Sequence, residues 1–309
     1  MNRGVRGIVL GCAAGLVLAA STWSTAAAAI KVGAIFAVTG PASFLGGPEA
    51  RSAAMAVARI NREGGINGEQ IELIVKDSAG SPEKAVSFAK QLIEEERVVA
   101  IIGPSTSGES MAVKKIAEDG RTVLISCAAA EVIVDPVASY VFKTPQKDSF
   151  AARKIFAEMQ RQSITTIAVA SGNDGFGKAG KEQLEKLAPE FAIRVALSET
   201  YDSKATDLSA LVAKMKATRG IQAVVNWSVA PAQAIIAKNM RQGNWRVPLF
   251  QSHGFGHIRY AQAPGAAAQG NNYPSGLPLV DQCLPGTRPH QTTSTGDTPR
   301  ARDTPTEED

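Results

Sequence analysis

The chain has 309 residues, of which 44% are hydrophobic and 20% charged. This composition is typical of a folded globular protein and excludes a disordered or wholly membrane-embedded chain, while the length allows two lobes of ordinary domain size. The formal net charge is only +4 and the basic residues form no block, which excludes the footprint of a nucleic-acid-binding protein.

The first 29 residues have the pattern of a secretory signal peptide. Arg3 and Arg6 form a positively charged start, Ile8 to Ala20 is an apolar run, and Ala26 to Ala29 offers an A-x-A cleavage site. A membrane anchor is the alternative, but polar residues end the apolar run short of the roughly 20 residues that a span needs. A lipoprotein anchor through Cys12 is disfavoured because the apolar run continues beyond it. We therefore expect a cleaved, periplasmic protein.

From residue 30 the sequence alternates between apolar, β-prone runs and segments with apolar residues at helical spacing. In the first half we expect strands at 30–38, 71–75, 98–102 and 122–126, and helices at 48–62, 82–96 and 107–118. Ser81 is placed to cap the helix that begins at Pro82. In the second half we expect helices at 148–162, 176–187, 207–219 and 231–242, and strands at 166–170, 194–200, 223–227 and 247–251.

Near-continuous apolar strands separated by amphipathic helices are typical of parallel sheets that are covered on both faces. The number of units predicts an α/β chain with two Rossmann-like lobes, at residues 30–145 and 146–270. The stretch Tyr140 to Pro145 is the expected hinge, because it is extended and Pro145 disfavours helix at Thr144. Residues 271–309 are rich in Pro, Thr, Asp and Arg without apolar periodicity, which predicts a disordered tail.

Cysteine and histidine residues are few and scattered. The spacing of the three cysteines and three histidines matches no metal-ligand pattern, so we expect neither a metal nor a cofactor. Cys127, at the end of a predicted strand, is expected to act as a small apolar filler.

Five stretches of the chain together resemble the Leu/Ile/Val-type periplasmic binding proteins of ABC transporters. They read IKVGAIFAVTGPASFLGGPEARSAAMAVARINREGGING, VVAIIGPSTSGESMAV, VLISCAAA, YVFKTPQKDSF and VPLFQSHGFGHIRY. The resemblance covers about residues 30–270 and implies a type I periplasmic binding fold, with two lobes joined by three crossovers that close on a small ligand. It also implies a monomer that works with a membrane permease. In the family the chain then returns to complete the first lobe, and the loss of this match after about Gly270 suggests a truncated or frameshifted product.

The loop from Gly103 to Gly108 lies between a predicted buried strand and a helix N-terminus, where backbone N–H groups and the helix dipole favour an anion. The resemblance places the ligand's carboxylate on Ser107 and on the neighbouring groups of Thr106 and Gly108. The alternative is an ordinary strand-to-helix turn with a capping serine. The loop is not a phosphate-binding Walker loop, because no Gly-Lys-Ser/Thr follows it.

Two departures from the family concern the ligand's ammonium group. Family members have a hydroxyl where this chain has Ala130, next to backbone carbonyls at Ala128, and amino-acid binders have a carboxylate where this chain has His253. A histidine cannot replace that negative charge, although it can donate a hydrogen bond to an anion or a hydroxyl. We therefore expect a small organic or aromatic carboxylate without an α-amine, with a branched-chain amino acid as the alternative.

Three apolar side chains are candidates for the walls of the site. Trp227 ends a strand of the second lobe, where it could stack against a flat ligand or pack in the core. Leu45 and Phe176 are expected to add apolar walls, with ordinary packing as the alternative.

One motif points to an enzyme instead. Gly175-Phe-Gly177-Lys-Ala-Gly180 matches G-x-G-x-x-G, and Glu199 follows about 20 residues later, as in NAD-binding folds. Against this, four residues separate the strand from Gly175, and no nucleophile–base set or hydrolase motif can be assembled. We expect a non-enzymatic binding protein for transport; a periplasmic sensor or receptor is the second reading and an NAD-dependent enzyme a remote third.

Overall fold

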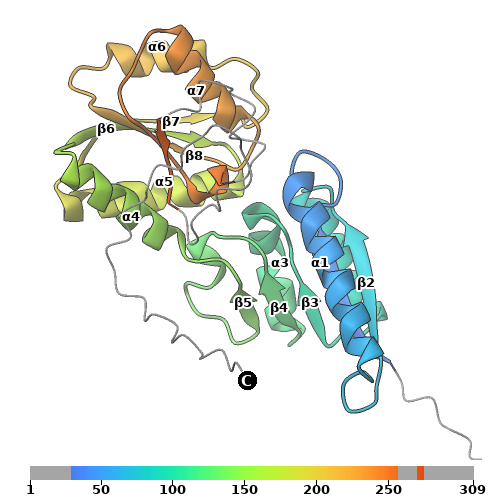
Figure 1. Cartoon of the computed structure of the whole chain (residues 1–309). Helices are drawn as coiled ribbons and strands as arrows, with labels where there is room; N and C mark the ends of the chain where they lie inside the picture. Colours follow the sequence, from blue (N-terminus) through green and yellow to red (C-terminus); the bar gives the residue numbers. More distant parts are fainter. Residues whose placement is uncertain (1–28, 257–269, 275–309) are drawn as a thin grey trace, which may run out of the picture.

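Two parallel β-sheets, each flanked by helices, form the computed structural model of the chain (Figure 1). The structure describes residues 29–256 and 270–274. The expected leader, with Arg3, Arg6 and Cys12, lies outside the described residues, as does the expected tail from residue 275 onwards. The predicted α/β architecture of two lobes is confirmed.

The first lobe contains a sheet with strand order β2-β1-β3-β4-β5, in which all neighbours are parallel. Its strands are β1 (Ile30–Phe36), β2 (Ile71–Asp77), β3 (Ala100–Ile102), β4 (Val123–Ser126) and β5 (Val141–Lys143). Its helices are α1 (Ser43–Arg62), α2 (Pro82–Lys90) with the π-helical turn η1 (Gln91–Glu95), α3 (Ser107–Asp119) and the 3₁₀ turn η2 (Glu131–Ile133). As predicted, the side chain of Ser81 caps α2 by accepting a hydrogen bond from Lys84 N–H at 3.3 Å.

The second lobe contains a sheet with strand order β10-β9-β8-β6-β7, also parallel. Its strands are β6 (Thr166–Gly172), β7 (Arg194–Tyr201), β8 (Ala223–Trp227), β9 (Leu249–Gln251) and β10 (Asn271–Asn272). Its helices are α4 (Asp148–Arg161), α5 (Gly175–Leu187), α6 (Ser209–Ala217) and α7 (Ala232–Gln242), with 3₁₀ turns η3 (Ala188–Phe191) and η4 (His253–Phe255). Every residue of the central strand β8 is buried, because α4 and α5 cover one face of this sheet and α6 and α7 the other.

Three elements differ from the sequence-based expectation. Helix α1 begins at Ser43, five residues before the expected start, so Pro48 lies inside it; its first turn is packed by Phe44, which is buried against Phe255 of the second lobe. Half of the expected hinge belongs to strand β5, and residues 144–147 join this strand to the second lobe. Asn271, predicted to start the tail, begins strand β10 and pairs with Leu249.

One face of the first sheet is only partly covered by the described residues. Helices α2 and α3 bury Ile101 and Leu124 on the opposite face. On the partly covered face, Ile102, Ile125 and Phe142 lie side by side in register, and Phe142 is 51% exposed. Such exposure is unusual for a parallel sheet, whose two faces are normally buried.

The two lobes meet where helices α3 and α5 begin. A Cβ atom on Gly175, the first residue of α5, would lie 2.7 Å from the Cα atom of Gly108 in the first turn of α3. Ala179, one turn further along α5, is buried in the core of the first lobe. The two helix N-termini therefore approach more closely than a residue larger than glycine at position 175 would allow.

The glycine pattern that resembles a dinucleotide motif is explained by this packing. A Cβ atom on Gly177 would lie 2.0 Å from the carbonyl oxygen of Gly172, and one on Gly180 would lie 2.0 Å from Nε1 of Trp227. All three glycines of the pattern thus make close contacts inside the protein.

We predict that Gly180→Ala destabilises the protein, because its methyl group would overlap the indole of the fully buried Trp227. The free energy of unfolding in urea should fall by about 1–3 kcal/mol. Gly47→Ala is the matched control, since its methyl group would meet only the flexible Arg51 side chain, at 3.6 Å, in a helix that favours alanine. Equal stability of the two variants would contradict this account of the motif.

Candidate functional site

A cavity of about 330 Å³ lies between the two lobes, a volume that suits a small molecule. It is lined by residues that follow the carboxyl ends of β3, β4, β8 and β9, together with the first turns of α1, α3 and α5. Ligands of open α/β sheets bind at this edge. The lining residues are Phe44, Leu45, Ser105, Thr106, Ser107, Cys127, Ala128, Ala129, Pro145, Gln146, Phe176, Val229, His253, Gly254, Gly256 and Pro274.

The N-terminus of the 13-residue helix α3 lies at this cavity. The Thr106 hydroxyl accepts from Glu109 N–H at 3.4 Å and the Glu109 carboxylate accepts from Thr106 N–H at 3.1 Å, which forms a capping box. The hydroxyl also donates to this carboxylate at 2.5 Å. The backbone N–H groups of Ser107 and Gly108 have no acceptor among the described residues. A helix N-terminus with free N–H groups carries a partial positive charge and attracts an anion.

Only one of the three hydroxyls in this loop keeps its proton free. The Ser105 hydroxyl donates to the carboxylate of Glu49 in a very short hydrogen bond, and Thr106 is engaged in the capping box. The Ser107 oxygen accepts from the N–H of Ala130 at 3.3 Å, which leaves its own proton for another acceptor. Ser107 is therefore the hydroxyl that can donate to a bound anion, with Ala130 fixing its position from behind.

Apolar side chains form the opposite walls of the cavity. Phe44 and Leu45 come from the first turn of α1, Phe176 from the first turn of α5, and Val229 from the segment after β8. Cys127 also lines the cavity, and burial raises the pKa of its thiol to about 12, so it remains a neutral filler as expected.

Trp227 does not line the cavity, so it packs in the core and does not stack against a ligand. Its side chain is fully buried in the second lobe, and its ring centroid lies 5.7 Å from that of Phe176 and 5.6 Å from that of His253. The His253 ring in turn meets Phe176 edge to face at 5.2 Å. Trp227 thus supports the two rings that form the wall instead of facing a ligand itself.

His253 brings a polar ring to this wall. Its side chain is 12% exposed, and neither of its nitrogens has a hydrogen-bond partner among the described residues. Burial, with a smaller contribution from the Lys143 ammonium, lowers the pKa of His253 to about 4, so the ring is neutral near pH 7.

Asp148, the first residue of α4, lies behind His253 and was not identified as a site residue from the sequence. Its carboxyl group is fully buried, both oxygens lack a hydrogen-bond partner among the described residues, and Oδ1 lies 4.0 Å from Nε2 of His253. Burial raises the pKa of Asp148 to about 8, although Lys143 opposes the shift. Sequence reasoning saw only a helix-starting aspartate; its burial depends on the packing of both lobes.

The nine residues proposed from the sequence divide into two groups. Six of them line the cavity: Leu45, Thr106, Ser107, Ala128, Phe176 and His253. Gly108, Ala130 and Trp227 lie next to it, as a helix contact, a backbone donor to Ser107 and a buried support. Gln146 and Val229 also line the cavity but were not predicted from the sequence. Gln146 follows the expected hinge, and Val229 follows the end of the predicted strand 223–227.

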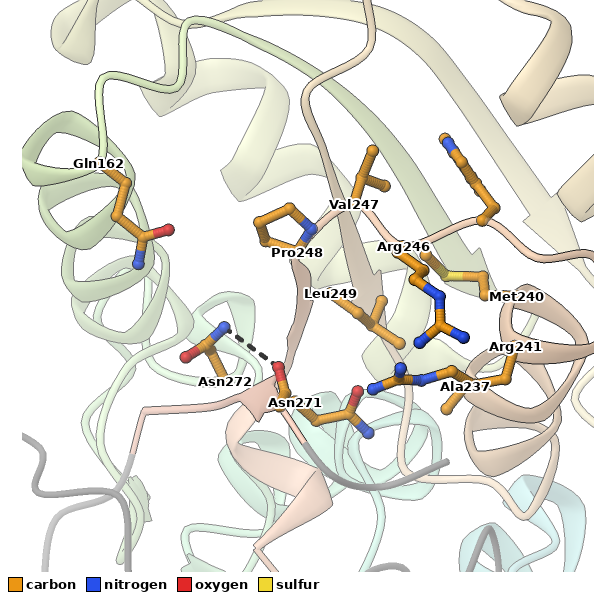
Figure 2. Close-up of a pocket in the computed structure, with 12 residues that line it drawn as sticks. Gln162, Ala237, Met240, Arg241, Arg246, Val247, Pro248, Leu249, Asn271 and Asn272 are labelled. Carbon is orange, nitrogen blue, oxygen red and sulfur yellow. Dashed lines mark hydrogen bonds between the residues drawn. The ribbon is translucent and has the colours of Figure 1, made fainter. Parts of the chain in front are cut away.

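A second cavity of about 260 Å³ lies at the other end of the second sheet (Figure 2). Arg241, Arg246 and Asn271 contribute polar groups to it, next to the start of β9. Because it lies at the amino ends of the strands, it is not where the fold presents ligands.

Within residues 29–256 and 270–274, no helix is long and apolar enough to cross a membrane. The same residues contain no group of three or more His, Cys, Asp or Glu side chains that could hold a metal ion.

Comparisons with known proteins agree on one family. A sequence model described as periplasmic binding protein matches residues 29–286. The chain is 27% identical to the leucine-, isoleucine-, valine-, threonine- and alanine-binding protein of Pseudomonas aeruginosa, over 87% of this chain and 72% of that protein. It is 29% identical to Leu/Ile/Val-binding protein homolog 7 of Brucella melitensis, over 80% of this chain and 63% of that protein.

Solved structures give the same result. An extracellular ligand-binding receptor from Rhodopseudomonas palustris superposes with a TM-score of 0.73 at 25% identity, covering 79% of this chain and 66% of the other. The branched-chain amino acid transporter substrate binding protein LivJ from Streptococcus pneumoniae, in complex with isoleucine, gives a TM-score of 0.68 at 26% identity, covering 77% of this chain and 68% of the other. The chain thus spans about two thirds of the length of these proteins.

We predict that Asp148→Asn stabilises the protein more strongly as pH rises. The folded-state pKa of Asp148, about 8, exceeds the usual 3.8, so between these pH values the folded protein holds a proton that the unfolded chain has released. Wild-type stability therefore falls over this window, by up to about 1.4 kcal/mol per pH unit, and the asparagine removes that loss. The difference in melting temperature between variant and wild type should grow from pH 5 to pH 8.

Asp119→Asn, at an exposed position of α3, is the control and should change the melting temperature little at either pH. A constant difference between Asp148→Asn and wild type from pH 5 to pH 8 would contradict the buried, protonated state of Asp148.

Proposed function

Because the chain belongs to the periplasmic binding protein family, we propose that it is the substrate-binding protein of an ABC importer of the branched-chain amino acid type, which captures a small carboxylate between its lobes. The family match covers residues 29–286. The family binds ligands without catalysing a reaction and works outside the cytoplasm, which fits the expectations from the sequence. The importer, the permease partner and the ligand are the parts that we propose.

One observation carries the choice of a carboxylate. The free proton of the Ser107 hydroxyl and the unpaired N–H groups of Ser107 and Gly108 meet at the N-terminus of α3. The two donors of Ser107 lie at one end of the cavity, and the Gly108 N–H lies beside them, outside the lining residues. Hydrogen bonds to a charged acceptor are the stronger ones, and a carboxylate has two oxygens to receive them.

The lining argues against an α-amine on the ligand. None of the described residues that line the cavity is an aspartate or glutamate, and Ala128, Ala129 and Ala130 carry no hydroxyl. An ammonium group would find backbone carbonyls but no opposite charge, which leaves a buried cation poorly paired. The apolar walls of Phe44, Leu45, Phe176 and Val229 suit an aromatic or short aliphatic acid.

A branched-chain amino acid is the second candidate ligand. The printed names of the relatives support it, since one binds leucine, isoleucine, valine, threonine and alanine and another is complexed with isoleucine. The apolar walls would accept such side chains equally well. The two candidates differ in one property, the demand for an ammonium partner, which a binding experiment can measure.

Ligand capture would use closure of the lobes around the cavity. We assign the lobes to residues 30–145 and 146–270, after a signal peptide at residues 1–29 that directs export. Residues 144–147 join β5 to α4 and would bend between open and closed states. A ligand that contacts both lobes only in the closed state stabilises that state, which a permease can then recognise. A monomeric sensor or receptor would use the same movement.

We predict that benzoate binds the purified chain more tightly than L-leucine does. Isothermal titration calorimetry should give a dissociation constant for benzoate at least tenfold below that for L-leucine, because only the amino acid brings an unpaired ammonium group. 4-Methylvalerate (4-methylpentanoate), which keeps the isobutyl group and carboxylate of leucine without the amine, is the matched control and should bind. Tight leucine binding without any response to the two acids would overturn the choice of ligand class.

Ser107→Ala should weaken benzoate binding by roughly ten- to a hundredfold, because a charge-assisted hydrogen bond contributes about 1.5–3 kcal/mol. The melting temperature of the unliganded variant should fall moderately, because the buried N–H of Ala130 loses its acceptor. Ser139→Ala, at an exposed position between η2 and β5, is the control and should bind like the wild type. Unchanged affinity in Ser107→Ala would show that the ligand does not use this hydroxyl.

A further inference from the structure

Two phenylalanine rings, one from each lobe, pack together beside the interlobe cavity. Phe44, in the first turn of α1, is 6% exposed, and Phe255, the last residue of η4, is 3% exposed. They form a separate apolar cluster, against which Leu45 of the first lobe and Val229 and Tyr273 of the second lobe pack. Neither phenylalanine belongs to the larger apolar clusters that form the cores of the lobes, so this contact joins the lobes to each other.

The contact lies away from the place where the chain crosses between the lobes. Residues 144–147 follow β5 at one edge of the first sheet, whereas α1 follows β1, and β3 and β4 lie between β1 and β5. Figure 1 shows α1 and β5 on opposite sides of this lobe. Since neighbouring strands are about 4.8 Å apart, the three steps from β1 to β5 span roughly 14 Å. Pro145 and Phe44 both line the cavity, which is therefore bounded by the covalent crossing on one side and by the contact between Phe44 and Phe255 on another.

The backbone holds each of the two rings in a fixed place. In the first lobe, a Cβ atom on Gly46 would lie 2.4 Å from the backbone of Ala37, so the first turn of α1 packs directly on the chain that follows β1. In the second lobe, Phe255 N–H donates to the carbonyl oxygen of Ser252 at 3.0 Å, and the Ser252 hydroxyl donates to the carbonyl oxygen of Ser228 at 2.8 Å. The rings therefore separate when the lobes move apart as bodies.

We propose that Phe255 is a positioning residue that holds the lobes closed through Phe44 and so controls how quickly a ligand enters and leaves. The residues around it, His253, Gly254 and Gly256, line the cavity and Phe255 does not, so it acts without touching the ligand. This inference rests on the proposed function, because exchange of a ligand requires a ligand between the lobes.

The physical basis is the burial of two aromatic rings. Opening the lobes would expose both phenylalanines to water, which the hydrophobic effect opposes. The contact joins protein groups alone, so it stabilises the closed lobes with a ligand or without one. Its loss should therefore make opening more frequent in both cases, and speed both the entry and the release of a ligand.

The test measures the exchange of benzoate in Phe255→Ala by stopped-flow tryptophan fluorescence. Trp227 is a suitable reporter because it packs against Phe176 and His253, which line the cavity. The association and dissociation rate constants should both rise at least fivefold, and the dissociation constant, which is their ratio, should change less than either. An unchanged dissociation rate constant in Phe255→Ala would overturn the proposal.

Three further variants provide controls. Phe255→Leu keeps an apolar side chain in contact with Phe44, so its rate constants should return toward those of the wild type. Tyr273→Ala removes the ring whose centroid lies 5.9 Å from that of Phe255, and it should raise both rate constants by a smaller factor. If Phe255→Ala folds poorly, wild-type rate constants in Tyr273→Ala would overturn the proposal instead. Phe150→Ala, at a 62% exposed position of α4, is the matched control and should exchange benzoate like the wild type.

A measurement without benzoate separates this inference from the proposed function. The radius of gyration of Phe255→Ala, measured by small-angle X-ray scattering in the absence of benzoate, should exceed that of the wild type, because the lobes spend more time apart. If the wild type does not bind benzoate but the two radii differ, the proposed ligand class fails and the role of Phe255 in closure stands. If benzoate binds but the radii and the exchange rates are equal in the two proteins, the proposed function stands and the role of Phe255 is overturned.

Discussion

The contact between helices α3 and α5 determines the geometry of the site. Gly175 lets the first turns of the two helices approach until a Cβ atom at this position would lie 2.7 Å from the backbone of Gly108. This approach places Ser107, one residue before Gly108, and Phe176, one residue after Gly175, at the same cavity. The meeting of a polar end from one lobe and an apolar wall from the other therefore depends on the absence of a side chain at Gly175.

Around this contact the protein divides its polar groups between structure and binding. The hydroxyl of Ser105 donates to Glu49 and that of Thr106 donates to Glu109, and these two hydrogen bonds fix the loop. The hydroxyl of Ser107 accepts a hydrogen bond but keeps its own proton free. On the other side, Trp227 uses its bulk to hold the rings of Phe176 and His253 in place. The unpaired donors at the N-terminus of α3 are then the place where the fold leaves hydrogen bonds for a ligand to complete.

Much of this fold could be predicted from the sequence because local signals agree with the tertiary structure. The cap at Ser81 could be predicted from its residue type, and the bounds of β8 from its apolar run. The loops that line the cavity could be predicted because ligands bind at the carboxyl ends of parallel strands. The early start of α1 could not be predicted, because Phe44 is held by contacts with the other lobe. In the same way, the G-x-G-x-x-G pattern could not be interpreted from the sequence alone. Its glycines can allow a pyrophosphate to approach the backbone, but here they allow close packing within the protein, as at the indole of Trp227.

Burial was the property that the sequence concealed within the site. A stretch of sequence shows that Asp148 can start a helix but not that both of its oxygens lose solvent, and it does not show which hydroxyl of the Ser105 to Ser107 loop remains uncommitted. These properties arise from atoms of the two lobes facing each other. The sequence-based site was therefore right about the region, and the structure was needed to assign the separate tasks within it.

The central claim is that an acid lies between the lobes with its negative end at the N-terminus of α3. A crystal structure of the protein with benzoate tests it most directly. The account predicts that the carboxylate oxygens lie within hydrogen-bond distance of the Ser107 hydroxyl and the Ser107 and Gly108 amides, with the ring against Phe176. A benzoate bound with its carboxylate turned to His253, or bound outside the interlobe cavity, would contradict it.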